Sequence, residues 1–167
     1  MMTNLSVDDL FAMAIEFERN GVAFYTRAAA SAAGRPHAAL LLRLAAMEQM
    51  HEKRFAALRR TLSEETASAA PFEPPEEKAL YLKAMADTRV FPVSGPIPEE
   101  LANANGLADA LRYAIDREKD SVVFYSTMQE FVPLHQGREQ IQAIIAEELG
   151  HVHLLTAMEL ERNVTLG

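Results

Sequence analysis

The sequence repeats itself at a spacing of 100 residues, and this repeat limits what the chain can fold into. The segment around Glu18 matches the segment around Glu118, and the segment around Glu48 matches the segment around Glu148. Apolar residues and polar exceptions recur together, in the pairs Phe11 and Leu111, Ala14 and Ala114, Ile15 and Ile115, Phe24 and Phe124, Tyr25 and Tyr125, Leu41 and Ile141, Leu44 and Ile144, His51 and His151, Phe55 and Leu155, and Leu58 and Met158. One structural unit therefore occurs twice in the chain.

The apolar residues within each copy follow the spacing of an α-helix. One stripe advances in steps of three and four residues, through Leu41, Leu44, Glu48, His51, Phe55 and Leu58. Alanine, leucine, glutamate, methionine and arginine dominate the composition, which favours helix, and no strand-like alternation bounded by turn signals stands out. We therefore expect an all-α fold.

Start and stop signals divide each copy into a helical hairpin. Ser6 opens a Ser-Val-Asp-Asp sequence typical of a helix N-cap, and Gly34 is placed to end the first helix. The predicted helices cover 6–33, 36–62, a short segment at 76–89, 107–131 and 138–163.

The connection between the two hairpins is long for a compact domain, unless it crosses over other elements. Such a crossover is a feature of the ferritin-like four-helix bundle, in which the adjoining helices of the two hairpins run parallel. We therefore expect a single ferritin-like domain over 1–167, with hairpin one at 6–62, a crossover linker at 63–106 and hairpin two at 107–163.

Each copy carries one glutamate in the apolar stripe of its first helix and the pattern Glu-x-x-His in the stripe of its second. Counted from residue 34, Glu18 lies 16 residues before the turn (34 − 18) and Glu48 lies 14 residues after it (48 − 34). At about 1.5 Å per residue, both glutamates lie roughly 21–24 Å from the turn. The second copy gives the same result, so packing of the four helices would bring four carboxylates and two imidazoles to one level of the core.

Four carboxylates buried without partners are costly unless they are protonated or matched by positive charge. No lysine or arginine repeats at that level of the stripes, whereas two divalent cations would supply four positive charges. Oxygen and nitrogen ligands without sulfur suit iron or manganese, and zinc also accepts them. The pattern is that of di-metal helical bundles. It predicts six metal ligands: Glu18, Glu48, His51, Glu118, Glu148 and His151.

Four segments carry a family resemblance, namely ERNGVAFY at 18–25, EQMH at 48–51, EKDSVVFY at 118–125 and ELGH at 148–151. Over about residues 6–62 and 107–162 the chain resembles the rubrerythrin branch of the ferritin-like family, whose members are non-haem di-iron proteins. They reduce hydrogen peroxide with electrons from a rubredoxin-like iron centre. The resemblance implies that Glu48 and Glu148 bridge the two metal ions. It also implies that Glu18 and Glu118 are terminal carboxylate ligands and that His51 and His151 are terminal nitrogen ligands.

Two features depart from the pattern of that family. The chain contains no cysteine, so iron–sulfur ligation is excluded within it, and any electrons would come from a separate donor protein. Ser121 stands three residues after Glu118, where rubrerythrins carry an additional carboxylate, and this weighs against efficient peroxide turnover.

Other polar residues flank the predicted ligands. Tyr25 and Tyr125 could hydrogen-bond a ligand carboxylate or take part in redox chemistry, and we favour a structural role beside the ligands over a direct one. Glu147 lies about 100° around the helix from Glu148, so we expect it in solvent. His37 and His135 fall near predicted turns, where we expect surface residues.

The leading functional hypothesis is a di-iron oxidoreductase that reduces hydrogen peroxide or dioxygen, with manganese or zinc as alternative metals. One alternative is a non-catalytic metal-binding protein that sequesters iron or uses a di-metal site for structure. Another is a metal-free helical interaction domain.

Charge and hydropathy limit the kinds of partner that the protein could bind and the cellular location that we expect for it. A formal net charge of −8 without a basic face argues against nucleic acid. No apolar run approaches the roughly 18 residues of a membrane span, and the N-terminus lacks a signal peptide, so we expect a soluble cytoplasmic protein. Apolar residues of the crossover point to a homodimer because the bundle would not fully cover them: Tyr81, Leu82, Met85 and Phe91.

Overall fold

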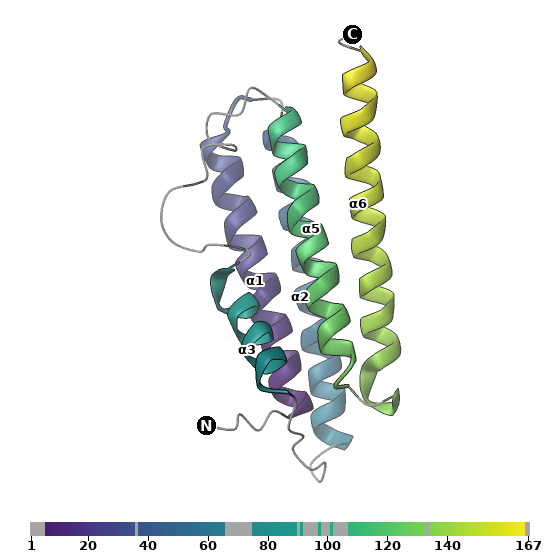
Figure 1. Cartoon of the computed structure of the whole chain (residues 1–167). Helices are drawn as coiled ribbons and strands as arrows, with labels where there is room; N and C mark the ends of the chain where they lie inside the picture. The colour runs from purple at the N-terminus through teal and green to yellow at the C-terminus, as the bar shows by residue number, and fades with distance from the viewer. Residues whose placement is uncertain are drawn as a thin grey trace.

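In a computed structural model the chain forms a bundle of four long helices (Figure 1). The structure describes residues 6–35, 37–65, 75–89, 91, 97, 101, 107–132 and 134–165. The long helices are α1 (Val7–Ser31), α2 (Ala38–Glu65), α5 (Leu107–Gln129) and α6 (Glu139–Thr165). The shorter helix α3 (Glu76–Ala84) continues into a π-helical turn, η1 (Met85–Arg89), and a second such turn, η2 (Leu134–Arg138), precedes α6. These ranges contain no strand, and the all-α prediction is confirmed.

The helices form two antiparallel hairpins, α1 with α2 and α5 with α6 (Figure 1). The helices α2 and α5 run in the same direction, and α3, which lies between them in the sequence, packs beside the bundle (Figure 1). The stacked rings of Phe17 and Phe124, with centroids 4.5 Å apart, place α1 beside α5. Contact between His51 and Glu147 places α2 beside α6. This arrangement is the ferritin-like topology that the long crossover predicted.

The ends of α1 are set by local chemistry. The Ser6 hydroxyl accepts a hydrogen bond from the Asp9 amide at 3.1 Å, and the Ser6 amide donates to Asp9 Oδ2 at 2.8 Å, which completes a capping box. Gly34, in the turn after α1, has a φ of 79°, a conformation that glycine adopts without strain. The second hairpin differs slightly from expectation, since α5 ends at Gln129 rather than at residue 131.

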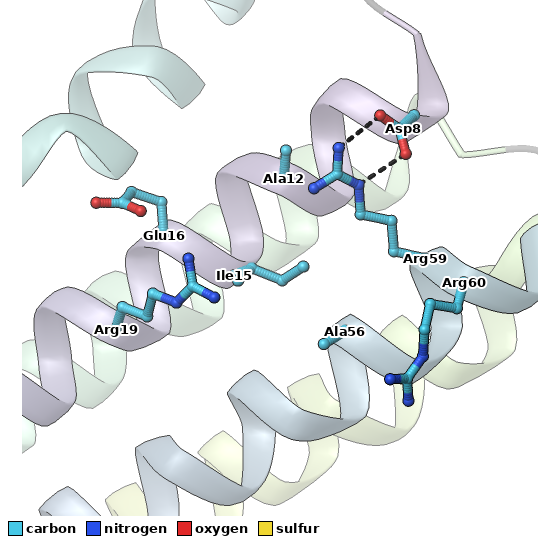
Figure 2. Close-up of a pocket in the computed structure, with 8 residues that line it drawn as sticks. All are labelled: Asp8, Ala12, Ile15, Glu16, Arg19, Ala56, Arg59 and Arg60. Atoms are coloured by element: carbon cyan, nitrogen blue, oxygen red, sulfur yellow. Dashed lines mark hydrogen bonds and ion pairs between the residues drawn. The ribbon is translucent and has the colours of Figure 1, made fainter. Parts of the chain in front are cut away.

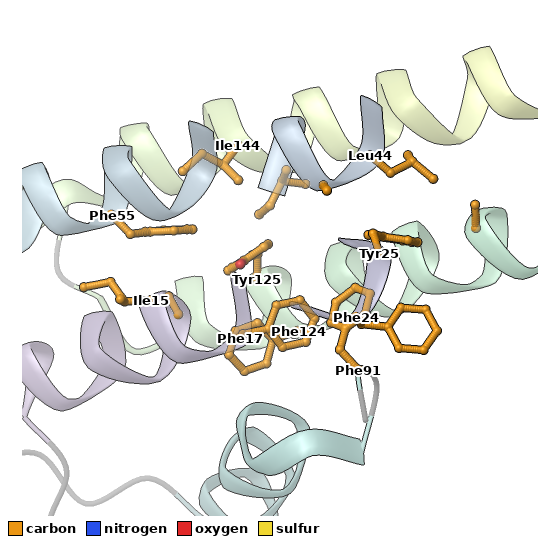
Figure 3. Close-up of a cluster of buried hydrophobic side chains, with 14 of the residues drawn as sticks. Ile15, Phe17, Phe24, Tyr25, Leu44, Phe55, Phe91, Phe124, Tyr125 and Ile144 are labelled. Carbon is orange, nitrogen blue, oxygen red and sulfur yellow. The ribbon is translucent and has the colours of Figure 1, made fainter. Parts of the chain in front are cut away.

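Aromatic side chains from both hairpins and the crossover build the core around the middle of the bundle (Figure 3). Phe91, which follows η1, lies edge-on to Phe17 with ring centroids 5.3 Å apart and also contacts Tyr25. Nearby, the buried Asn20 amide donates a hydrogen bond of 2.9 Å to the Ala86 carbonyl. The crossover is therefore fixed to α1 by both apolar and polar contacts.

These contacts bear on the predicted homodimer. Leu82 and Phe91 are buried within the single chain, so the expectation that the bundle leaves them uncovered is wrong, because the crossover folds back onto α1. Tyr81 and Met85 are partly buried against the same core. The dimer itself stays a prediction. No helix in the described ranges has the length and apolar character needed to cross a membrane.

Candidate metal centre

Six side chains from all four long helices meet inside the bundle. They are Glu18 of α1, Glu48 and His51 of α2, Glu118 of α5, and Glu148 and His151 of α6. All are buried except His151, which is partly exposed. Every residue that the sequence predicted as a metal ligand is thus brought to one cluster.

The donor atoms of this cluster form two groups that share one carboxylate. The first group consists of Glu18, Glu48, His51 and Glu148, and the second of Glu118, Glu148 and His151. Within each group, one donor atom per residue lies within 4.8 Å of all the others. Glu148 belongs to both groups, which is the placement of a bridging ligand. Glu48, which the family resemblance also implied as a bridge, belongs only to the first.

Glu148 contacts both imidazoles, with one oxygen for each. Its Oε1 lies 3.0 Å from Nδ1 of His51, and its Oε2 lies 3.1 Å from Nδ1 of His151. The Nδ1 atom of His151 is also 3.3 Å from Glu118 Oε2. The two imidazole rings stack with centroids 5.6 Å apart, and the distances above show that both present Nδ1 to the carboxylates.

Among the described residues, several buried polar atoms of the cluster have no hydrogen-bond partner, namely Glu18 Oε2, Glu48 Oε2, Glu148 Oε1 and His51 Nδ1. The last two are close enough for an ion pair, yet their geometry is not that of a hydrogen bond. Buried polar atoms seldom lack partners, because each has given up its hydration. Oxygen and nitrogen donors that converge in this way fit divalent cations such as iron, manganese or zinc.

Burial raises the pKa of three of the four glutamates in the cluster. Burial raises the pKa of Glu18 well above its usual range, and the neighbouring Glu48 carboxylate adds to the effect. Burial also raises the pKa of Glu118, and it raises the pKa of Glu48 to about 7. Burial opposes ionisation of Glu148 as well, but contacts with both histidines outweigh it and lower that pKa to about 2.

The histidines supply part of the missing positive charge. Burial disfavours the imidazolium of His151, but Glu118 and Glu148 beside it prevail and raise its pKa to about 10. The pKa of His51 is raised in the same way, with Glu148 overcoming the effect of burial. These raised pKa values favour protonation of the cluster, so divalent cations would displace protons on binding.

The two tyrosines, which repeat in sequence, differ in their contacts. The Tyr125 hydroxyl donates a hydrogen bond to Glu18 Oε1, one of the contacts considered from the sequence. The Tyr25 hydroxyl is buried and has no partner within the described part of the chain. Burial raises the pKa of both phenols well above their usual range, so both remain protonated donors.

The positions one turn after the glutamates of α1 and α5 also differ. Ser121 is buried, and its hydroxyl donates to the Arg117 carbonyl at 3.1 Å, so it is turned to its own helix and not to the cluster. Gly21 is its counterpart in the first hairpin. A Cβ atom there would come within 3.0 Å of Glu48 Cδ, so the absence of a side chain leaves the space that Glu48 fills.

Glu147 was expected in solvent, and its side chain is indeed 41% exposed, but it also makes contacts that the sequence did not predict. Its Oε2 lies 3.3 Å from Nε2 of His51, and its Oε1 accepts a hydrogen bond from Nη1 of Arg54. A signal was present in the repeat, because the counterparts of Glu147 and Arg54 at the 100-residue offset are Met47 and Leu154. These two departures from the repeat lie directly behind one of the two histidines.

His37 was expected at the surface, but it is completely buried at the start of α2. Neither of its ring nitrogens has a hydrogen-bond partner among the residues that the structure describes. The prediction for His135 falls on a side chain outside the described residues.

A surface pocket between α1 and α2 lies apart from the cluster (Figure 2). Across its end, Arg59 forms two hydrogen bonds of 2.7 Å with the Asp8 carboxylate. None of the six cluster residues lines this pocket, so it does not give access to the buried donors.

The fold and the cluster define a ferritin-like four-helix bundle with a buried carboxylate–histidine site suited to two metal ions. The chain belongs to the Rubrerythrin family, whose family model matches residues 9–159. A ferritin-like diiron-carboxylate protein from Thermotoga maritima has a similar fold, with a TM-score of 0.58 and 19% sequence identity over 97% of this chain and 99% of that chain. No curated protein matches the sequence.

Proposed function

We propose that the protein is a di-iron carboxylate oxidoreductase that reduces hydrogen peroxide or dioxygen with electrons from a separate donor protein. The observation that carries the proposal is the convergence of four buried glutamates and two histidines, four of whose buried donor atoms lack a hydrogen-bond partner among the described residues. Membership of the Rubrerythrin family and the diiron-carboxylate description of the Thermotoga maritima protein favour iron over manganese or zinc.

Each group of donors would hold one ion. Glu18, Glu48 and His51 would complete the first position and Glu118 and His151 the second, with Glu148 shared between the two. A reduced iron pair supplies the two electrons needed to cleave an O–O bond, and two protons complete the conversion of hydrogen peroxide to two water molecules. The burial of the cluster would keep bulk water away from bound ions.

The surrounding residues would orient the ligands and carry protons. The Tyr125 hydroxyl holds one oxygen of Glu18 and leaves the other, Oε2, free to bind a cation. His151 is the member of the cluster with the most exposed side chain, at 18%. We therefore propose that protons enter from solvent at the side of the cluster formed by α5 and α6.

The test begins with protein purified without a metal-affinity resin. We expect two iron ions per chain after anaerobic loading, fast oxidation when hydrogen peroxide is added, and repeated turnover with a chemical or protein reductant. Optical spectra before and after the addition would follow the oxidation. A single stoichiometric oxidation without turnover, whichever donor is supplied, would contradict the catalytic proposal.

A non-catalytic metal-binding protein is the second candidate function. It is favoured by Ser121, whose hydroxyl is engaged with the Arg117 carbonyl at the position of the family's additional carboxylate. Uptake of iron far beyond two ions per chain would indicate sequestration, and bound zinc that resists exchange for iron would indicate a structural site. Metal content unchanged by the double substitution Glu48→Gln and Glu148→Gln would contradict both functions.

A further inference from the structure

The two halves of the metal centre repeat their ligands but not the residues behind them. Glu147 and Arg54 stand behind His51, as described above, whereas the repeat places Met47 and Leu154 at the equivalent positions in the other half. Neither Met47 nor Leu154 can accept a hydrogen bond from an imidazole with the strength of a carboxylate. Within the described part of the chain, His51 therefore contacts an arginine–glutamate ion pair, whereas the equivalent positions beside His151 hold no charged residue.

The contact with Glu147, which is itself paired with Arg54, fixes the orientation of the His51 ring. Its Nδ1 faces Glu18 and Glu148, at 3.8 and 3.0 Å, while its Nε2 lies 3.3 Å from Glu147 on the opposite side. When Nε2–H donates to Glu147, the neutral ring carries its lone pair on Nδ1, where it points at the other donors. The tautomer that binds a cation is thus selected by a residue that is not itself a ligand.

Arg54 forms an ion pair with Glu147, so the contacts that orient His51 connect the two hairpins. Arg54 lies on α2, one turn after His51, and Glu147 lies on α6, next to Glu148. Arg54 donates to Oε1 of Glu147, which leaves Oε2 for the imidazole. The three side chains form a line from the surface to the cluster, because Arg54 and Glu147 are about 40% exposed and His51 only 1%.

The other position is less constrained. His151 has a side chain that is 18% exposed, and its contacts with Glu118 and Glu148 are both made by Nδ1. Its group contains three donors instead of four. A ligand that is less ordered before binding costs more conformational entropy to fix, and fewer donors give less binding energy.

We propose that Glu147, held by Arg54, is a positioning residue that makes the His51 side of the centre the tighter of two unequal metal positions. The first divalent cation then binds to Glu18, Glu48, His51 and Glu148, and the second binds more weakly to Glu118 and His151 with the shared Glu148. The inference rests on the proposed metal centre but not on its catalytic activity.

The test is a titration of metal-free protein with cobalt(II), followed by visible absorbance and by calorimetry. The wild-type protein should bind two ions in two resolved steps. Glu147→Met, which gives the first half the residue found in the second, should weaken the tighter step by about 10–100-fold, the usual cost of losing a histidine's outer hydrogen-bond partner. The two steps should then approach each other in affinity. Glu147→Gln keeps an oxygen acceptor for Nε2–H and should retain most of the separation.

A second measurement tests, in metal-free protein, whether Glu147 determines the tautomer of His51. Nitrogen NMR of the histidine side chains at a pH high enough to give neutral rings should show His51 with its proton on Nε2 in the wild-type protein. Glu147→Met should produce a mixture of tautomers. Arg54→Leu should give a smaller change in the same direction if Glu147→Met is too unstable to study.

Asp8→Asn provides the matched control. It breaks the Arg59–Asp8 ion pair, whose side chains are 40% and 49% exposed, compared with 40% and 41% for Arg54 and Glu147. This control should leave both binding steps and the His51 tautomer unchanged. Two wild-type steps of equal affinity, or an unchanged tighter step in Glu147→Met, would overturn the inference while leaving the metal centre intact. Failure of the wild-type protein to bind two ions would instead count against the proposed function.

Discussion

Replacing Gly21 with alanine would test how closely α1 and α2 must approach at the metal centre. A Cβ atom at this position would lie 3.0 Å from Glu48 Cδ, 3.1 Å from Cγ and 3.3 Å from Oε1. Ordinary van der Waals contact of a Cβ begins at 3.4 Å, so the Glu48 side chain would have to shift by a few tenths of an ångström.

Two opposing effects set the size of the change. Overpacking of a well-packed interior costs about 1–3 kcal/mol, while alanine in place of glycine within a helix contributes about 0.5–1 kcal/mol. We therefore expect Gly21→Ala to lose about 1 kcal/mol of unfolding free energy, which corresponds to a fall in Tm of about 2–4 °C for a chain of this size. Because Glu48 is displaced, the variant should also bind divalent cations more weakly.

Gly150→Ala in α6 is the matched control. Gly150 is also within a helix, but a Cβ atom there would meet nothing within 4 Å, so only the helix-propensity gain of about 0.5–1 kcal/mol should remain. Urea unfolding of the metal-free proteins and a cobalt(II) titration would compare the two variants. The reasoning is refuted if Gly21→Ala stabilises the protein as much as Gly150→Ala and binds metal as tightly as the wild type.

Three further predictions concern the cluster itself. The metal-free protein should lose stability as pH rises from 6 to 9, because the folded state binds more protons than the unfolded chain. Because its pKa is raised, Glu48 contributes stability that is lost as the pH rises from 4.5 to about 7. The raised pKa of His151 likewise gives stability that is lost between pH 6.5 and about 10. Urea unfolding at several pH values measures this, and increasing stability over that range would contradict it. Tyr125→Phe should cost about 1–3 kcal/mol by leaving a buried carboxylate oxygen unpaired, whereas Tyr25→Phe should be close to neutral, and the reverse order in urea unfolding would contradict the assignment. Glu148→Gln should lower the metal content after dialysis from two ions per chain to one or none, since both donor groups share this residue, and retention of two ions would exclude Glu148 as the bridge.

The membership of the cluster could be predicted because it depends on properties of single helices. The 3.6-residue period decides which side chains share a face, and the rise per residue decides their height. Glu18 and Glu48 therefore could be placed at one level from their distances to Gly34 alone. The long crossover then fixed the direction of the second hairpin, which brought Glu118 and Glu148 to the same level.

The contacts between helices could not be predicted in this way. The position of Glu147 around α6 indicated solvent, but α2 packs beside it and brings Arg54 and His51 within reach. Tyr25 and Tyr125 occupy equivalent places in the repeat, yet only Tyr125 reaches a carboxylate.

The sequence by itself determined the helices, their pairing into two hairpins and the six residues that face the centre, because these follow from spacing along the chain. Only the tertiary structure decided what the unequal residues of the two halves do: it placed Arg54 and Glu147 beside His51 and left His151 partly open to solvent. The physical reason is that the rotation and offset of neighbouring helices depend on the packing of residues more than 90 positions apart, which periodicity within one helix does not contain.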